Sequence, residues 1–126
     1  MISIDSGKDR IIFAIDTGER LADALRWVDL LKDHVGLFKV GKESFTHFGP
    51  AILREITARG GNVFLDLKFH DIPNTVARAA EAAVRWDVAM FNVHAGGGRE
   101  MMRQAVSAVR AAAGKKETPP PVVLAV

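Results

Sequence analysis

Three charged residues stand at the end of a predicted apolar strand, and their types are suited to acid–base chemistry. In the stretch FLDLKFHDIPNT, Asp66 and Lys68 alternate with apolar residues, and Asp71 follows them. Charges at a strand end ordinarily form a surface ion pair worth about 0–1 kcal/mol. A lysine held among carboxylates is also a charged proton donor close to a place where negative charge can develop. A surface ion pair and a catalytic array are therefore both open interpretations of this stretch.

A second lysine, Lys39, ends the preceding predicted strand and favours the catalytic interpretation. Alternating charges in a water-poor pocket interact strongly, because each pair at 4 Å contributes about 4 kcal/mol at an effective dielectric of 20. Desolvation offsets most of that gain, so such an array rarely serves stability. We therefore predict that Lys39, Asp66, Lys68 and Asp71 form a preorganised array that favours a transition state.

The elements that must position these residues alternate along the chain. Apolar β-rich runs and helical periodicities predict strands at 10–16, 36–41, 62–68, 88–94 and 122–126, helices at 19–34, 50–59, 75–86 and 99–113, and a linker at 115–121. The first four strands begin near residues 10, 36, 62 and 88, at a constant spacing. A regular unit of strand and crossover helix predicts a parallel sheet with right-handed connections.

Two folds accommodate this order of elements: a small doubly wound sheet of the flavodoxin kind, and the beginning of a (β/α)8 barrel. The polar residues decide between them, because each of the first four strands carries polar or charged residues at its C-terminal end. These are Asp16, Lys39, Asp66 with Lys68, and Asn92 with His94. A barrel gathers such strand ends around one mouth. We therefore expect residues 1–126 to be a single domain, the N-terminal part of a (β/α)8 barrel with about five strands and four helices, truncated in the fifth strand.

Composition excludes several classes of protein. The formal net charge is only +2 and no basic run exceeds Lys115-Lys116, which argues against a nucleic-acid-binding protein. The absence of cysteine excludes disulfides and cysteine–zinc sites and fits a reducing compartment. The N-terminal stretch lacks the apolar core of a signal peptide, and no apolar run approaches the ~18 residues of a membrane span. We expect a cytoplasmic protein that binds neither nucleic acid nor membranes.

The motif DLKFHDIPNTV at residues 66–76 resembles the signature of the orotidine 5′-phosphate decarboxylase family. The resemblance extends to AID at 14–16, FKVGKESFTHFGP at 38–50 and FNVHAGGG at 91–98, so it covers nearly the whole chain in order. It implies a barrel of the ribulose-phosphate-binding type. It also implies decarboxylation of orotidine 5′-phosphate to uridine 5′-phosphate in pyrimidine biosynthesis, without a cofactor or a metal.

The resemblance also implies a role for each charged residue. Lys68 would protonate the carbanion left at pyrimidine C6, and Asp66 would lie beside the departing carboxylate. Lys39 would hold Asp66 and a ribose hydroxyl, and Asp16 would bind another ribose hydroxyl. By the same analogy, the family acts as a homodimer in which Asp71 and Thr75 reach into the partner's site.

The loops that hold phosphate in barrels usually follow the seventh and eighth strands. We therefore expect the phosphate-binding residues to lie beyond this chain and the 126 residues by themselves to be inactive.

Other interpretations stay open for individual residues. Asp16 would equally well cap the following helix through an Asx turn. His94 with Asn92 would line the barrel mouth, although a hydrogen-bonded core histidine is the favoured interpretation of His94. The glycines at 96–98 suit either an anion cradle or a mobile loop.

Two alternative functions remain for the whole chain. A group of Asp66, His70, Asp71 and His94 would suit a magnesium-dependent sugar-phosphate decarboxylase or aldolase of the same superfamily, but the ammonium of Lys68 would repel a cation there. A small flavodoxin-like binding domain is the other alternative.

Overall fold

The computed structural model describes residues 4–16 and 18–126. They form two compact units: an N-terminal unit that ends at Asp66 and a C-terminal unit from Leu67 to Val126. The division falls inside the third strand, so each unit contains part of that strand.

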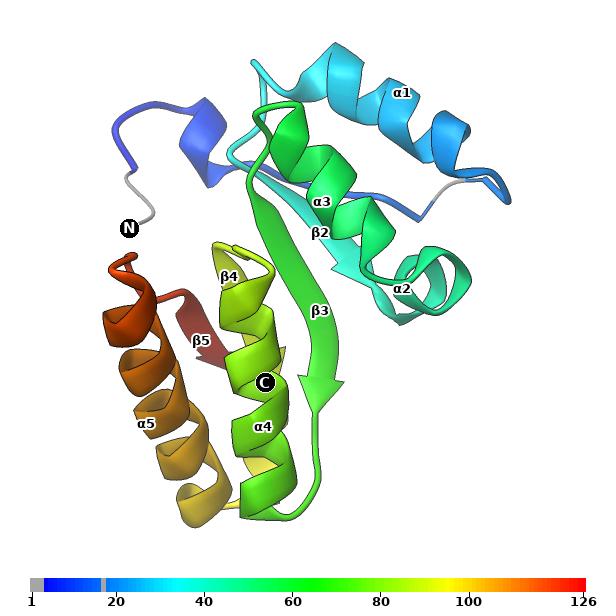
Figure 1. Cartoon of the computed structure of the whole chain (residues 1–126). Coiled ribbons are helices and arrows are strands. Elements are labelled where there is room, and N and C mark those ends of the chain that lie inside the picture. Colours follow the sequence, from blue (N-terminus) through cyan, green and yellow to red (C-terminus); the bar gives the residue numbers. More distant parts are fainter. Residues whose placement is uncertain (1–3, 17) are drawn as a thin grey trace. The chain divides into compact units, whose positions relative to one another are not determined.

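The N-terminal unit alternates strands and helices, as the sequence predicts (Figure 1). Its elements are η1 (Lys8–Arg10), β1 (Ile12–Ala14), α1 (Leu21–Leu31), β2 (Leu37–Gly41), α2 (Lys42–Phe48), α3 (Ala51–Ala58) and the first four residues of β3 (Val63–Phe69).

The order of its strands excludes the flavodoxin alternative. β2 lies between β1 and β3 and is parallel to both, with Phe38 opposite Phe13 of β1 and opposite Val63 of β3. A flavodoxin-like sheet would instead place its first strand between the second and third. Sequential parallel neighbours are the arrangement of a (β/α)8 barrel.

Apolar helix faces and the central strand make the core of this unit. The fully buried residues of α1 are Ala24 and Val28, and those of α3 are Ile52, Leu53 and Ile56. α1 and α3 contact each other (Figure 1), and the guanidinium of Arg59 lies 3.4 Å from Asp29. A Cβ at Gly61 would lie 2.8 Å from Ile56 and 3.0 Å from the Phe38 ring, so glycine is needed where the chain enters β3.

The C-terminal unit contains two long helices and two complete strands (Figure 1). Its elements are the last three residues of β3, α4 (Pro73–Arg85), β4 (Met90–Val93), η2 (Ala95–Gly97), α5 (Arg99–Lys116) and β5 (Val122–Ala125). β4 and β5 are parallel, with Asn92 opposite Leu124.

Small residues let the two long helices pack side by side (Figure 1). The buried residues are Val76, Ala80, Ala83 and Val84 on α4, and Met101, Ala105, Val109 and Ala113 on α5. Alanine loses almost no side-chain entropy on burial and allows two helix backbones to approach closely.

The structure corrects the sequence prediction at two places. Residues 42–48 form α2, a helix that the sequence analysis did not predict. Lys115 and Lys116 were predicted to begin a linker, but they form the last turn of α5, where cations stabilise the helix dipole. Lys116 also makes an ion pair with Asp87.

Among residues 4–16 and 18–126, no helix combines the length and the apolar character that a membrane crossing would need.

Candidate active site

Lys39 lies between two carboxylates in the N-terminal unit. Its ammonium is 3.3 Å from Oδ2 of Asp66 and 3.8 Å from Oδ2 of Asp16. The side chains of Lys39 and Asp66 are 23% and 13% exposed, whereas Asp16 is half exposed at 52%. The structure thus brings together three of the residues that the sequence predicts for the site. The Lys39–Asp66 pair is largely withdrawn from water, so its attraction is screened less than that of a surface pair.

The strand register explains why these residues meet. Ala14 of β1 lies opposite Lys39, and Asp66 of β3 lies opposite Gly41. Side chains two residues apart on a strand share a face, so the long side chain of Lys39 extends over Gly41 toward Asp66. A Cβ at Gly41 would be 3.4 Å from Nζ of Lys39 and 3.6 Å from Oδ1 of Asp16. Glycine at this position leaves the ammonium the space between the two carboxylates.

Ser44 on α2 fixes the chain next to Asp16. Ser44 is 4% exposed, and its hydroxyl donates a 2.5 Å hydrogen bond to the carbonyl of Ile15. The helix α1 begins at Leu21, and its N-cap, Arg20, makes no side-chain capping hydrogen bond. The alternative interpretation of Asp16 as the cap of this helix is therefore wrong. The carboxylate of Asp16 instead pairs with the ammonium of Lys39.

The C-terminal unit contains Lys68, and its backbone is unusual. Lys68 has φ 51°, in the left-handed region that a residue with a long side chain rarely adopts. Such a conformation costs of the order of 1–3 kcal/mol and persists only where surrounding contacts enforce it. The Lys68 side chain is exposed. A regular strand, with side chains alternating between its two faces, would not contain this conformation.

Asn92 of β4 holds the backbone of Lys68. Its Oδ1 accepts the Lys68 amide hydrogen at an N···O distance of 2.8 Å, and Asn92 is only 2% exposed. One residue further on, the amide of His94 donates to the carbonyl of Phe69 at 2.9 Å. From the sequence, Asn92 is predicted only to line the barrel mouth. A polar residue inside the apolar run VAMFNVH was the available signal for a more specific role.

Asp71 and Thr75 lie where β3 leads into α4. Both are exposed, and Oδ1 of Asp71 accepts the amide hydrogen of Ile72 at 2.6 Å. Pro73 occupies the first turn of α4, where its missing N–H is not needed. The two residues thus belong to one exposed helix start, accessible to a ligand or to another chain.

His94 is exposed, so its favoured interpretation as a core histidine is wrong. Its ring stacks on His70 with centroids 4.7 Å apart, and Nδ1 accepts the amide hydrogen of Gly96 at 3.1 Å. In the part of the chain that the structure describes, no group of three histidine, aspartate or glutamate residues could hold a metal ion.

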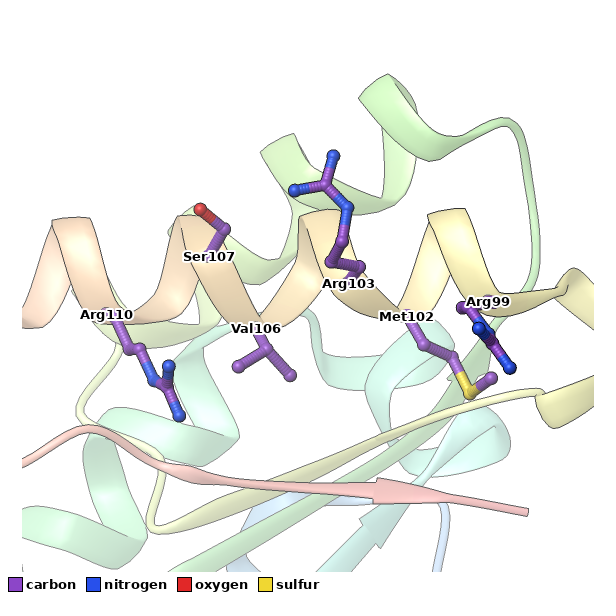
Figure 2. A pocket seen from close by; sticks show the side chains of 6 residues that line it. All are labelled: Arg99, Met102, Arg103, Val106, Ser107 and Arg110. Atoms are coloured by element: carbon purple, nitrogen blue, oxygen red, sulfur yellow. The ribbon is translucent and has the colours of Figure 1, made fainter.

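A pocket of about 560 Å³ lies along α5, and its lining residues include none of the predicted site residues. Figure 2 shows Met102 and Val106 on one side of the helix, with Arg99 and Arg110 beside them. Its lining residues include no carboxylate and no lysine, so this pocket does not offer the acid–base chemistry of Lys39, Asp16 and Asp66.

Three comparisons relate this chain to known proteins. The model of the Orotidine 5'-phosphate decarboxylase / HUMPS family matches residues 9–124. A protein of Syntrophus aciditrophicus named orotidine 5′-phosphate decarboxylase is 58% identical over 118 residues, which cover 94% of this chain and 47% of that protein. A protein of the same name from Moorella thermoacetica is 54% identical over 119 residues, with the same two shares.

The solved structure of orotidine 5′-phosphate decarboxylase from Lactobacillus acidophilus aligns with a TM-score of 0.74 and 35% identity, over 91% of this chain and 51% of that one. The chain spans about half the length of the curated relatives it matches. These alignments confirm the predicted fold class, in which the chain corresponds to the N-terminal half of a (β/α)8 barrel.

Proposed function

The chain belongs to the Orotidine 5'-phosphate decarboxylase / HUMPS family, and from that premise we propose that it supplies the acid–base residues for decarboxylation of orotidine 5′-phosphate to uridine 5′-phosphate. The observation that carries this proposal is the ammonium of Lys39 between the carboxylates of Asp16 and Asp66. A fixed array of alternating charges suits a reaction in which one negative charge leaves and another develops.

The proposed reaction proceeds in two steps at pyrimidine C6. The carbon–carbon bond to the carboxylate breaks, carbon dioxide leaves, and the electron pair stays on C6. Lys68 then gives a proton from its ammonium to C6 and recovers one from water. Asp66 lies two residues from Lys68 on β3, beside the departing carboxylate in this scheme. The left-handed backbone of Lys68 supports the assignment, because strained residues cluster at active sites.

The remaining residues bind the substrate in this scheme. Lys39 binds a ribose hydroxyl while it holds Asp66, and Asp16 binds a second hydroxyl with its exposed carboxylate. Asp71 and Thr75, exposed at the start of α4, complete the site of a second subunit in a homodimer. The protein acts in the cytoplasm and needs neither a cofactor nor a metal ion in this proposal.

Two alternatives are less well supported. The named relatives at 54–58% identity are orotidine 5′-phosphate decarboxylases and not magnesium-dependent sugar-phosphate enzymes. The strand order of the N-terminal unit argues against a flavodoxin-like binding domain.

The test uses what we call the family-length protein: this chain joined to the remaining half of the Syntrophus aciditrophicus relative. That half is included because phosphate loops of barrels usually follow the seventh and eighth strands. We expect uridine 5′-phosphate to form from orotidine 5′-phosphate at the same rate with added Mg²⁺ and with a chelator. Activity that depends on Mg²⁺, or turnover of a sugar phosphate and not of the nucleotide, would favour the superfamily alternative.

A further inference from the structure

Asn92 is one of two buried polar residues in the described part of the chain, the other being Ser44. Its backbone belongs to β4 and lies opposite Leu124 of β5, whereas its side chain reaches toward β3. Burial of an amide side chain among apolar residues is costly unless the amide makes hydrogen bonds. The observed bond to the Lys68 amide is therefore a specific reason for asparagine at this position.

Lys68 needs such a contact because its backbone is left-handed. A left-handed residue with a Cβ reverts to the extended or helical region unless its neighbours hold it. The 2.8 Å bond from the Lys68 N–H to Oδ1 of Asn92 fixes the amide plane from which the lysine side chain departs. The neighbouring bond between the His94 amide and the Phe69 carbonyl holds the following peptide.

We infer that Asn92 is a positioning residue for Lys68: by accepting its amide hydrogen, Asn92 keeps the strained backbone in the conformation that aims the ammonium at the reacting carbon. This inference rests on the proposed function for the role of Lys68. It adds a residue that acts on the reaction through the lysine backbone. Because the lysine donates its proton in the chemical step, loss of Asn92 should affect kcat more than KM.

The decisive variants differ only in the acceptor. Asn92→Leu keeps the approximate volume and removes the acceptor, and Asn92→Asp keeps an oxygen at the same position. Val93→Ala is the matched control, because Val93 is the next residue of β4 and equally buried but makes no side-chain bond to Lys68. All three are made in the family-length protein, with amide exchange of Lys68 followed in ¹⁵N-lysine-labelled samples.

In Asn92→Leu we expect the Lys68 amide to lose its protection from exchange and kcat to fall roughly 10- to 100-fold, the range that corresponds to one lost bond to a buried donor. KM should change by less than a factor of about three, because it reports binding shared by ground and transition states. Asn92→Asp should restore protection and part of kcat, and Val93→Ala should keep both.

Several results would overturn the inference. One is a wild-type Lys68 amide that exchanges with solvent at the rate of an unprotected amide. That result would show that Asn92 does not hold the Lys68 backbone, even if the Asn92→Leu variant does not fold. Another is a kcat in Asn92→Leu no lower than in Val93→Ala. If the wild-type family-length protein does not decarboxylate the nucleotide, the proposed function fails instead, and the exchange measurement alone decides whether Asn92 holds Lys68.

Discussion

Replacement of Lys39 by methionine removes the cation between Asp16 and Asp66 and keeps a chain of similar length. At an effective dielectric of 20, the attractions at 3.3 Å and 3.8 Å are each worth about 4–5 kcal/mol before desolvation. Removal of one partner of a buried pair costs about 3–5 kcal/mol, because the remaining charge loses a counter-charge where water does not replace it. Asp16 is half exposed and recovers its hydration, so most of the loss comes from Asp66. We expect the free energy of unfolding to fall by about 2–4 kcal/mol.

The assay is urea denaturation of the family-length protein at pH 7, with Lys42→Met as the control. Lys42 is the exposed first residue of α2, so its replacement should change stability by less than about 0.5 kcal/mol. A second change, Asp66→Asn, removes the charge that Lys39→Met leaves behind. The double variant should therefore recover most of the lost stability, which gives a favourable coupling energy in a double-mutant cycle.

Two results would refute this reasoning. If Lys39→Met were no less stable than Lys42→Met, the charge cluster would be a solvated surface feature. If Asp66→Asn added its own loss instead of restoring stability, Lys39 and Asp66 would not be coupled, whatever their distance.

Three further predictions concern other parts of the chain. Inactive Asp71→Asn and Lys68→Ala variants of the family-length protein should regain activity when mixed, because one site of the heterodimer then holds neither change; no recovery despite subunit exchange would place Asp71 in its own subunit's site. Hydrogen bonds from Arg103 and Gln104 lower the pKa of Glu100 from 4.5 to about 2, so its stabilising contribution is present above pH 4.5 and lost as the pH falls through about 2; an NMR titration of Glu100 with a midpoint near 4.5 would contradict this. Gly114 lies in the last turn of α5, and a Cβ added there would meet no atom within 4 Å, so Gly114→Ala should raise stability by about 0.5 kcal/mol in urea denaturation; a loss would contradict the helical propensity argument.

The strands could be predicted well because their signal is local. The first four begin at residues 12, 37, 63 and 90, within two residues of the predicted starts. Apolar runs bounded by glycine and polar residues carry that information in the sequence itself. Their charge and their place at strand ends then identified Lys39 and Asp66 as candidate site residues. In the structure, Nζ of Lys39 lies 3.3 Å from Oδ2 of Asp66.

The features that escaped prediction depend on contacts between distant residues. α2 has seven residues of mixed character, too few for a periodic pattern, and its buried contact is the bond from Ser44 to the Ile15 carbonyl. Short helices gain most of their stability from such tertiary packing. The need for glycine at position 41 likewise becomes visible only when the Lys39 ammonium and the Asp16 carboxylate are seen beside it.

Backbone conformation was the property hardest to predict from the sequence. No sequence pattern predicts the left-handed backbone at Lys68, because lysine is common in ordinary strands and helices. The contacts around Lys68 enforce the strained conformation, and these contacts are visible only in the structure. His94 was misjudged for a related reason. A histidine directly after an apolar strand resembles a core residue, yet the chain turns into η2 immediately after it and leaves the ring exposed against His70.

The most direct test of the central claim is the kcat of the Lys68→Ala variant of the family-length protein with orotidine 5′-phosphate. If Lys68 is the proton donor, kcat should fall at least about 100-fold, the smallest effect usual for a general acid. The urea midpoint should fall only slightly, because replacement of an exposed side chain usually changes stability little. A folded Lys68→Ala variant with a kcat within about tenfold of the wild type would contradict the account and assign the proton to another group.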